Sequence, residues 1–218
     1  MSAVAESYMD AIAALPENAT LELRDVAWAD YENLLAEVGE ASGLRISYDT
    51  GIIKVMTLSS EHENYAEFIK RLVDRIGFVF RLKILCFGSA TMKRRRQDKG
   101  AEPDACFYIQ SAPLLGHKIK IDFNADPPPD VVVEIDIHHE SLDKFPIYAA
   151  LGVPEIWRYN GSQGDFYALE NGAYQKIETS RALPLLTSAI LTDFLNRVPE
   201  EGQYETLLAA EEWLASLK

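Results

Sequence analysis

The 218-residue sequence has only two cysteines and no long apolar run. Cys86 and Cys106 are too few for a disulfide framework or a structural zinc site. No window approaches the ~18 consecutive apolar residues of a membrane helix. The N-terminus lacks the basic segment and apolar run of a secretory signal. We therefore expect a soluble cytoplasmic protein without membrane association, in which both cysteines are strand thiols.

Several common site motifs are also missing. The sequence contains no GxGxxG, GxxxxGK[ST], GxSxG or CxxC, which removes the usual support for dinucleotide, P-loop, serine-hydrolase and redox functions. His138, His139 and Glu140 are consecutive, whereas zinc sites on helices use the i, i+4 spacing of HExxH. These three residues therefore do not predict zinc.

The apolar content is sufficient for one sizeable core, because hydrophobic residues make up 48% of the chain. We expect a single domain over 1–218, with its main part near 31–195 and a C-terminal helix over 199–218. The formal charge of −13 is concentrated at the two ends of the chain. The middle carries one basic cluster in a predicted loop: Lys93, Arg94, Arg95, Arg96 and Lys99. This basic cluster could contact phosphates, or it could be a solvated loop or a partner of the acidic ends.

The apolar spacing predicts helices that flank a mixed central sheet. Helical periodicity covers 28–38, a long segment from Ser60 with Glu63 as a capping box, 141–152, 187–198 and 204–217. Alternating or β-branched runs predict strands at 44–49 and 52–57 as a hairpin, then at 84–90, 104–109, 131–137, 155–159, 164–169 and 173–177. We interpret this order as one α/β domain. The amphipathic C-terminal helix would dock on its own domain or form a dimer contact.

Acidic residues inside apolar strands are the strongest chemical signal. Asp104 opens one strand, and Glu134 and Asp136 end another on a single face. A buried carboxylate is costly unless it is paired or binds a metal, so neighbouring strands would bring Asp104 and Glu134 together around Mg²⁺ or Mn²⁺. Lys144 would add a cation at the same end of the sheet. The alternative is a strand-end salt bridge, with Lys144 paired to Asp136 or Glu140.

Three segments resemble a known family: GAEPDACFYI from Gly100, PPPDVVVEIDI from Pro127, and SLDKFPIYAALGVPEIWRY from Ser141. They are similar to the Uma2 family, formerly a domain of unknown function abundant in cyanobacteria. The resemblance runs from about Tyr31 to Leu195. It implies the PD-(D/E)xK restriction-endonuclease-like fold, with a mixed central sheet flanked by helices, a divalent metal and hydrolysis of DNA.

The resemblance also implies roles for individual residues. Asp104 matches the motif aspartate and Glu134 the second metal-binding acid. The superfamily places lysine two residues later, where this chain has Asp136. Lys144 on the next helix is the natural substitute, and Asp136 would then be a further ligand or would fix Lys144. Possible accessory residues are His62, Glu63 and Glu102.

Two classes of function therefore stay open. The first is a Mg²⁺- or Mn²⁺-dependent DNA endonuclease, with Asp104, Glu134 and Lys144 at its centre and the basic cluster along the nucleic-acid backbone. The second is a DNA- or protein-binding regulatory module that kept the fold and lost full catalysis, as Asp136 permits. Hydrolysis of a smaller phosphodiester would use the same site. A homodimer is possible in each case.

Overall fold

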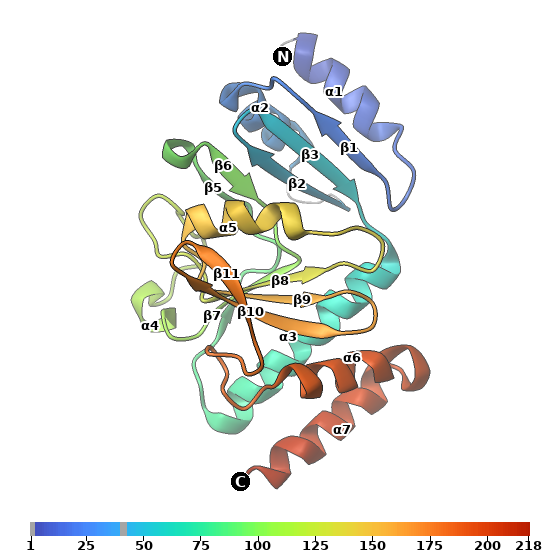
Figure 1. Cartoon of the computed structure of the whole chain (residues 1–218), viewed down its shortest axis with the longest axis vertical. Coiled ribbons are helices and arrows are strands. Elements are labelled where there is room, and N and C mark those ends of the chain that lie inside the picture. The colour runs from blue at the N-terminus through green and yellow to red at the C-terminus, as the bar shows by residue number, and fades with distance from the viewer. Residues whose placement is uncertain (1–2, 40–42) are drawn as a thin grey trace.

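The computed structural model describes residues 3–39 and 43–218, and in them the chain forms two β-sheets with helices around them (Figure 1). The smaller sheet lies at the top of the view with two helices, and the larger sheet lies below it. Among the described residues, no helix is both long and apolar enough to span a membrane. The expected α/β class with a mixed sheet flanked by helices is confirmed, whereas the single-domain boundaries stay a prediction.

The smaller sheet is antiparallel throughout, with the strand order β1-β3-β2-β6-β5. Its strands are β1 (Thr20–Leu23), β2 (Leu44–Asp49), β3 (Ile52–Thr57), β5 (Met92–Arg94) and β6 (Lys99–Ala101). The predicted hairpin is β2–β3, whose turn at Thr50 and Gly51 has positive φ at both positions. Helices α1 (Ala3–Ala13) and α2 (Trp28–Val38) contribute to the apolar cluster of this sheet.

The larger sheet is mixed and has the order β11-β10-β9-β8-β7-β4. Its strands are β4 (Leu85–Cys86), β7 (Ala105–Tyr108), β8 (Val131–Ile135), β9 (Glu155–Tyr159), β10 (Gly164–Glu170) and β11 (Ala173–Ile177). Only β8 and β9 are parallel among the described pairs. The helix α5 (Phe145–Leu151) connects them, as expected for a parallel crossover.

The two faces of β8 have different partners. Val131, Val133 and Ile135 join the cluster formed with α3 (Ser60–Phe80), α6 (Ser188–Glu201) and α7 (Gln203–Ser216). Val132 joins the cluster that includes Ile147, Tyr148 and Leu151 of α5. Because side chains alternate along a strand, Glu134 shares the α5 face with Val132. The short helix α4 (Ala112–Leu115) lies in the loop between β7 and β8.

Several predicted boundaries were wrong for identifiable reasons. Helix α3 is capped by Ser59, whose side chain accepts from the His62 amide, so the Ser60–Glu63 capping box does not form. Gly202, at φ 90°, divides the expected C-terminal helix into the end of α6 and α7. The expected strand 84–90 is reduced to two residues, and the predicted basic loop is the β5–β6 hairpin with a 3₁₀ turn over Arg95–Gln97.

Helix α7 packs on its own chain. This was the first of the two predicted alternatives, docking on its own domain or forming a dimer contact. Ala210 and Leu214 are buried, and α7 contacts both α3 and α6. Leu207 and Trp213 are half-buried against the same core, and Leu208 and Leu217 are exposed. A dimer contact stays a prediction. Of the two cysteines, Cys106 is buried in β7 and Cys86 is exposed in β4.

Candidate active site

Two carboxylates lie where the pairing of β7 and β8 ends. These strands pair antiparallel as far as Ala105 opposite Val133, so Asp104 and Glu134 are the next residues beyond this last pair. The Asp104 amide donates to the Val133 carbonyl at 2.9 Å, which ties Asp104 to β8. Each residue is 1% exposed. Like charges close to each other on a sheet destabilise it, so the pair needs compensating donors or cations.

Asp104 is satisfied from both sheets. Its Oδ2 accepts from the Ile135 amide at 2.8 Å, and its Oδ1 accepts from the Nε of Arg45 on β2 at 3.0 Å. The His62 Nε2 atom lies 3.1 Å from Oδ2, but its orientation does not make a hydrogen bond. Arg45 is buried and donates through Nη2 to Glu63 Oε1 at 2.8 Å. Thus the start of α3 and the smaller sheet both meet the larger sheet at Asp104.

Glu134 is satisfied by side chains from the segment after β8. Lys144 ends a 3₁₀ turn (Leu142–Lys144) and donates through Nζ to Glu134 Oε2 at 2.8 Å. The same Nζ donates to the Glu102 carbonyl at 3.3 Å. The Tyr148 hydroxyl of α5 donates to Glu134 Oε1. Lys144 is therefore a buried cation between two of the acidic segments predicted for the site.

Asp136 is not paired with Lys144, and it binds neither Asp104 nor Glu134. Its Oδ2 accepts from the Ser141 amide at 2.9 Å and from the Arg158 Nε of β9. The alternatives in which Lys144 pairs with Asp136 or Glu140 are therefore wrong, because Glu134 holds Lys144 in this position. Asp136 therefore stabilises the turn that leads to Lys144, and it does not contact Lys144 itself.

The three possible accessory residues differ in whether their side chains reach the site. His62 and Glu63 reach the site, through Asp104 and through Arg45 respectively. The Glu102 side chain points elsewhere: Oε2 accepts from the Ile46 amide at 2.8 Å, and Oε1 accepts from the Thr91 hydroxyl at 2.6 Å. Glu102 therefore connects strand segments and reaches Lys144 only through its main chain.

The basic cluster is mostly neutralised within the chain. Lys93 pairs with Glu32 at 3.0 Å, and Lys99 pairs with Asp49. Arg94 donates to the main-chain carbonyls of Phe123 and Leu151. Within the described residues, the two remaining members, Arg95 and Arg96, are exposed and form no ion pair. Lys99 opposes Asp49 at the end of β2 away from Arg45, so this hairpin turn lies beyond the far end of β2.

The surroundings push the pKa values of the two acids in opposite directions. Burial would raise the pKa of Asp104, but His62, Lys144 and Arg45 together lower it to about 2. Burial raises the pKa of Glu134 to about 7; Lys144 opposes this rise, and Asp104 and Asp136 add to it. Burial would lower the pKa of Lys144, but Glu134 and Asp104 raise it above its ordinary value. The lysine is therefore charged at neutral pH, and Glu134 exchanges a proton in that range.

The donor set fits a hard divalent cation with two protein carboxylates. Within residues 3–39 and 43–218, no group of three or more His, Cys, Asp or Glu side chains is arranged to hold a metal ion. Asp104 nevertheless lies close enough to Glu134 to raise its pKa, and the two carboxylates offer the oxygen ligands that Mg²⁺ and Mn²⁺ prefer. Such a site would take its other ligands from main-chain carbonyls, water and substrate phosphate, as Mg²⁺ sites commonly do.

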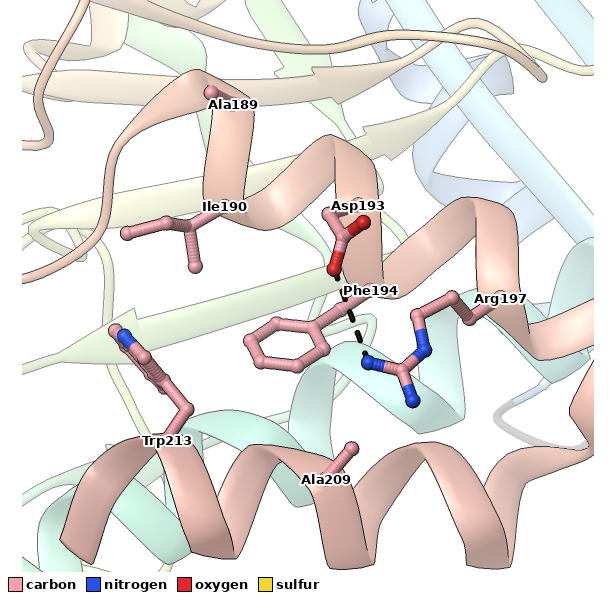
Figure 2. Close-up of a pocket in the computed structure, with 7 residues that line it drawn as sticks. All are labelled: Ala189, Ile190, Asp193, Phe194, Arg197, Ala209 and Trp213. Atoms are coloured by element: carbon pink, nitrogen blue, oxygen red, sulfur yellow. Dashed lines mark ion pairs between the residues drawn. The ribbon is translucent and has the colours of Figure 1, made fainter. Parts of the chain in front are cut away.

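A pocket of about 340 Å³ lies elsewhere, between α6 and α7. Its lining includes Phe194, Trp213 and the Asp193–Arg197 pair, whose charged atoms are 3.9 Å apart. Figure 2 shows these side chains on the two helices. None of the predicted site residues lines this pocket. The two carboxylates are instead covered by their partners, and Glu63 is the exposed member, with about half of its side chain in solvent.

Reasoning from the sequence missed Arg45 and Tyr148. Arg45 lies in an alternating strand pattern and Tyr148 in a helical pattern, and both patterns predict an ordinary buried position. In the structure Arg45 contacts Asp104 and Tyr148 contacts Glu134, which are distant in the chain. An arginine facing inward in the strand LRISYD was the available signal, because buried arginine needs an acidic partner.

Comparisons with known proteins identify the family and the fold. A family model described as "Uma2: Putative restriction endonuclease" matches residues 28–197, close to the expected extent. A solved structure described as a "putative nuclease belonging to DUF820" from Anabaena variabilis ATCC 29413 is similar in fold, with a TM-score of 0.50 and 14% identity. The match covers 69% of this chain and 90% of that one. No curated protein matches the chain.

Proposed function

Because the chain belongs to the Uma2 family, we propose that it is a metal-dependent endonuclease that hydrolyses phosphodiester bonds in DNA. One observation carries the proposal: Asp104 and Glu134 are buried together where the β7–β8 pairing ends, with Lys144 held 2.8 Å from Glu134. An acid pair with an adjacent lysine is the residue set that the family resemblance implies. Its lysine comes from the segment after β8 instead of from the position that Asp136 occupies.

Each residue has a chemical role in this proposal. Asp104 and Glu134 would hold Mg²⁺ or Mn²⁺, which would supply Lewis-acid stabilisation of phosphate charge and favour deprotonation of water. The ammonium group of Lys144 would stabilise negative charge on the phosphate during attack. Tyr148 would keep the Glu134 carboxylate oriented, and the Ile135 amide would do the same for Asp104. Arg95 and Arg96 would contact the DNA backbone away from the reacting phosphate.

The test is cleavage of plasmid and single-stranded DNA with Mg²⁺ or Mn²⁺, comparing wild type with Asp104→Asn and Lys144→Met. We expect each variant to lose at least about a hundredfold in rate, the range for removing one electrostatic group from a reacting centre. Asp165→Asn is the matched control, since Asp165 is a buried strand aspartate that pairs with Lys176 in β10–β11. Equal rates for wild type and Asp104→Asn would contradict the proposal.

A second candidate is a binding module that has lost catalysis. It is favoured by the missing third metal-ligating side chain among the described residues and by the cations that already occupy both carboxylates. Salt-sensitive DNA binding without metal-dependent cleavage would select it. Metal-dependent turnover of small phosphodiesters without polymer binding would indicate a nucleotide substrate.

A further inference from the structure

Arg45 places a positive charge on the Asp104 carboxylate. Its Nε donates to Asp104 Oδ1 at 3.0 Å, and the arginine is 6% exposed. The other oxygen, Oδ2, accepts from the main-chain amide of Ile135, which the sheet holds in place. A cation that binds Asp104 through Oδ1 would therefore displace the Arg45 guanidinium or lie directly beside its positive charge, and both cost binding free energy.

The same arginine has a second acidic partner. Its Nη2 donates to Glu63 Oε1 at 2.8 Å, and its Nη1 donates to the Leu44 carbonyl at 3.0 Å. Glu63 lies at the start of α3 with about half of its side chain exposed, whereas Asp104 is fully buried. A guanidinium presents its donors as a rigid fork, so a small shift can break one contact and keep the other. Glu63 and the Leu44 carbonyl thus provide a position for Arg45 away from Asp104.

Charge balance explains why the arginine is there. Without a metal ion, two neighbouring buried carboxylates repel each other and resist burial. Lys144 compensates Glu134, and Arg45 compensates Asp104. A divalent cation between the carboxylates would make one of these positive charges superfluous. Lys144 and Arg45 are similarly buried, but Arg45 also pairs with Glu63, about half of whose side chain is exposed to solvent.

We propose that Arg45 and a divalent cation compete for Asp104, and that Glu63 retains Arg45 at the rim when the cation binds. Arg45 is thus a positioning residue that holds the metal-free site in place and sets its metal affinity. This inference rests on the proposed function, since it assigns the metal to the same carboxylates.

The test is calorimetric titration of the folded full-length chain with Mn²⁺ alone. We expect Arg45→Gln to bind Mn²⁺ roughly tenfold more tightly than wild type, the effect of removing one competing charge-assisted hydrogen bond. Glu63→Gln should bind more weakly, because Arg45 then has Asp104 as its one acidic partner in the cluster. In the Arg45→Gln background, Glu63→Gln should have no further effect. A weaker affinity there too would make Glu63 a ligand and overturn the proposal.

Two further variants keep the test decisive. Arg94→Gln removes an arginine from the smaller sheet that touches neither carboxylate, so its Mn²⁺ affinity should equal wild type. Arg45→Lys keeps the charge but loses the fork, and it should bind Mn²⁺ with an affinity between wild type and Arg45→Gln. If Arg45→Gln does not fold, an Arg45→Lys affinity equal to or below wild type overturns the competition.

The outcomes separate the inference from the proposed function. Wild type that binds Mn²⁺ as tightly as Arg45→Gln would overturn the role of Arg45 and leave the metal site intact. Absence of Mn²⁺ binding in wild type, Arg45→Gln and Arg45→Lys alike would overturn both.

Discussion

Two buried glutamates on neighbouring strands of the larger sheet are held in opposite ways. Glu155 of β9 is 2% exposed, and its Oε2 accepts from the main-chain amides of Arg181 and Ala182 at 2.8 and 3.1 Å. Its Oε1 accepts from the Trp157 indole at 2.6 Å. Glu134 of β8 is equally buried, but its partners are the side chains of Lys144 and Tyr148.

The difference separates structural acids from candidate catalytic ones. Glu155 pairs with donors that have no other role, and it fixes the segment after β11 against the sheet. Glu134 lies near a second carboxylate and depends on a cation that could also serve a substrate. Burial of an acid in an apolar strand is therefore a weak signal alone, and the nature of its donors is the informative property.

The same substitution at both positions is the strongest test of this comparison. Glu155→Gln turns one acceptor into an amide group that faces main-chain N–H donors, so we expect a loss of about 2–5 kcal/mol in unfolding free energy. Glu134→Gln can accept from Lys144 and donate to the Tyr148 oxygen, so its loss should stay below about 2 kcal/mol. Urea unfolding measures both values. A larger loss for Glu134→Gln would reverse the assignment.

The pH dependence of stability should come from Glu134. Its pKa of about 7 exceeds the ordinary 4.5, so the folded state keeps a proton that the unfolded state has lost between these values. The unfolding free energy should therefore fall as pH rises from about 4.5 to 7, by an amount on the order of 1–3 kcal/mol. Asp104, with its lowered pKa, loses its contribution only in acid, as pH falls toward 2.

Urea unfolding at several pH values tests this assignment. Glu134→Gln should remove the decrease between pH 4.5 and 7 and leave the acid branch unchanged. An identical profile for wild type and Glu134→Gln would assign the decrease to another group.

The smallest expected changes in stability concern the three arginines of the β5–β6 hairpin, to which the same comparison applies. Arg94 is held by main-chain carbonyls, as Glu155 is held by main-chain amides, whereas Arg95 and Arg96 are exposed. Neutralising Arg95 and Arg96 should leave stability within about 0.5 kcal/mol and reduce the salt slope of DNA binding by about one per residue. Arg94→Gln should instead lower stability. Binding measured between low and moderate salt checks the slope, and an unchanged slope would remove this turn from the DNA contact.

Local patterns predicted the elements that carry the site. The run Val131–Val133 after three prolines identified the central strand, and the acids at its end marked the site edge. The resemblance then identified Lys144 as the lysine, and the structure places it on Glu134. The strand and helix predictions succeeded because strand alternation and helix periodicity depend on residues close in sequence, whereas the roles of the site residues stay predictions.

Long-range pairing explains what the sequence left undetermined. Arg45 and Asp104 are far apart in the chain, and only the meeting of two sheets brings them together. Asp136 was expected to be a further metal ligand or to fix Lys144. Its Oδ2 accepts from Arg158 of the neighbouring strand and from the Ser141 amide, so it reaches Lys144 only through the turn. The sequence also gives no local signal for the division into two sheets. The strands β5 and β6 of the smaller sheet have three residues each, which is too short for an alternating pattern to identify them.

One of the crossings between the two sheets, from β6 to β7, uses three residues, Glu102, Pro103 and Asp104. The Glu102 side chain accepts from the Ile46 amide of β2, and Asp104 exchanges hydrogen bonds with β8 in both directions through its amide and its carboxylate. Proline fixes the backbone between them. A crossing so short and so fully bonded leaves no room for a hinge. The two sheets should therefore open cooperatively as one unit in hydrogen exchange, and local fluctuations that admit substrate would fall to side chains such as Arg45.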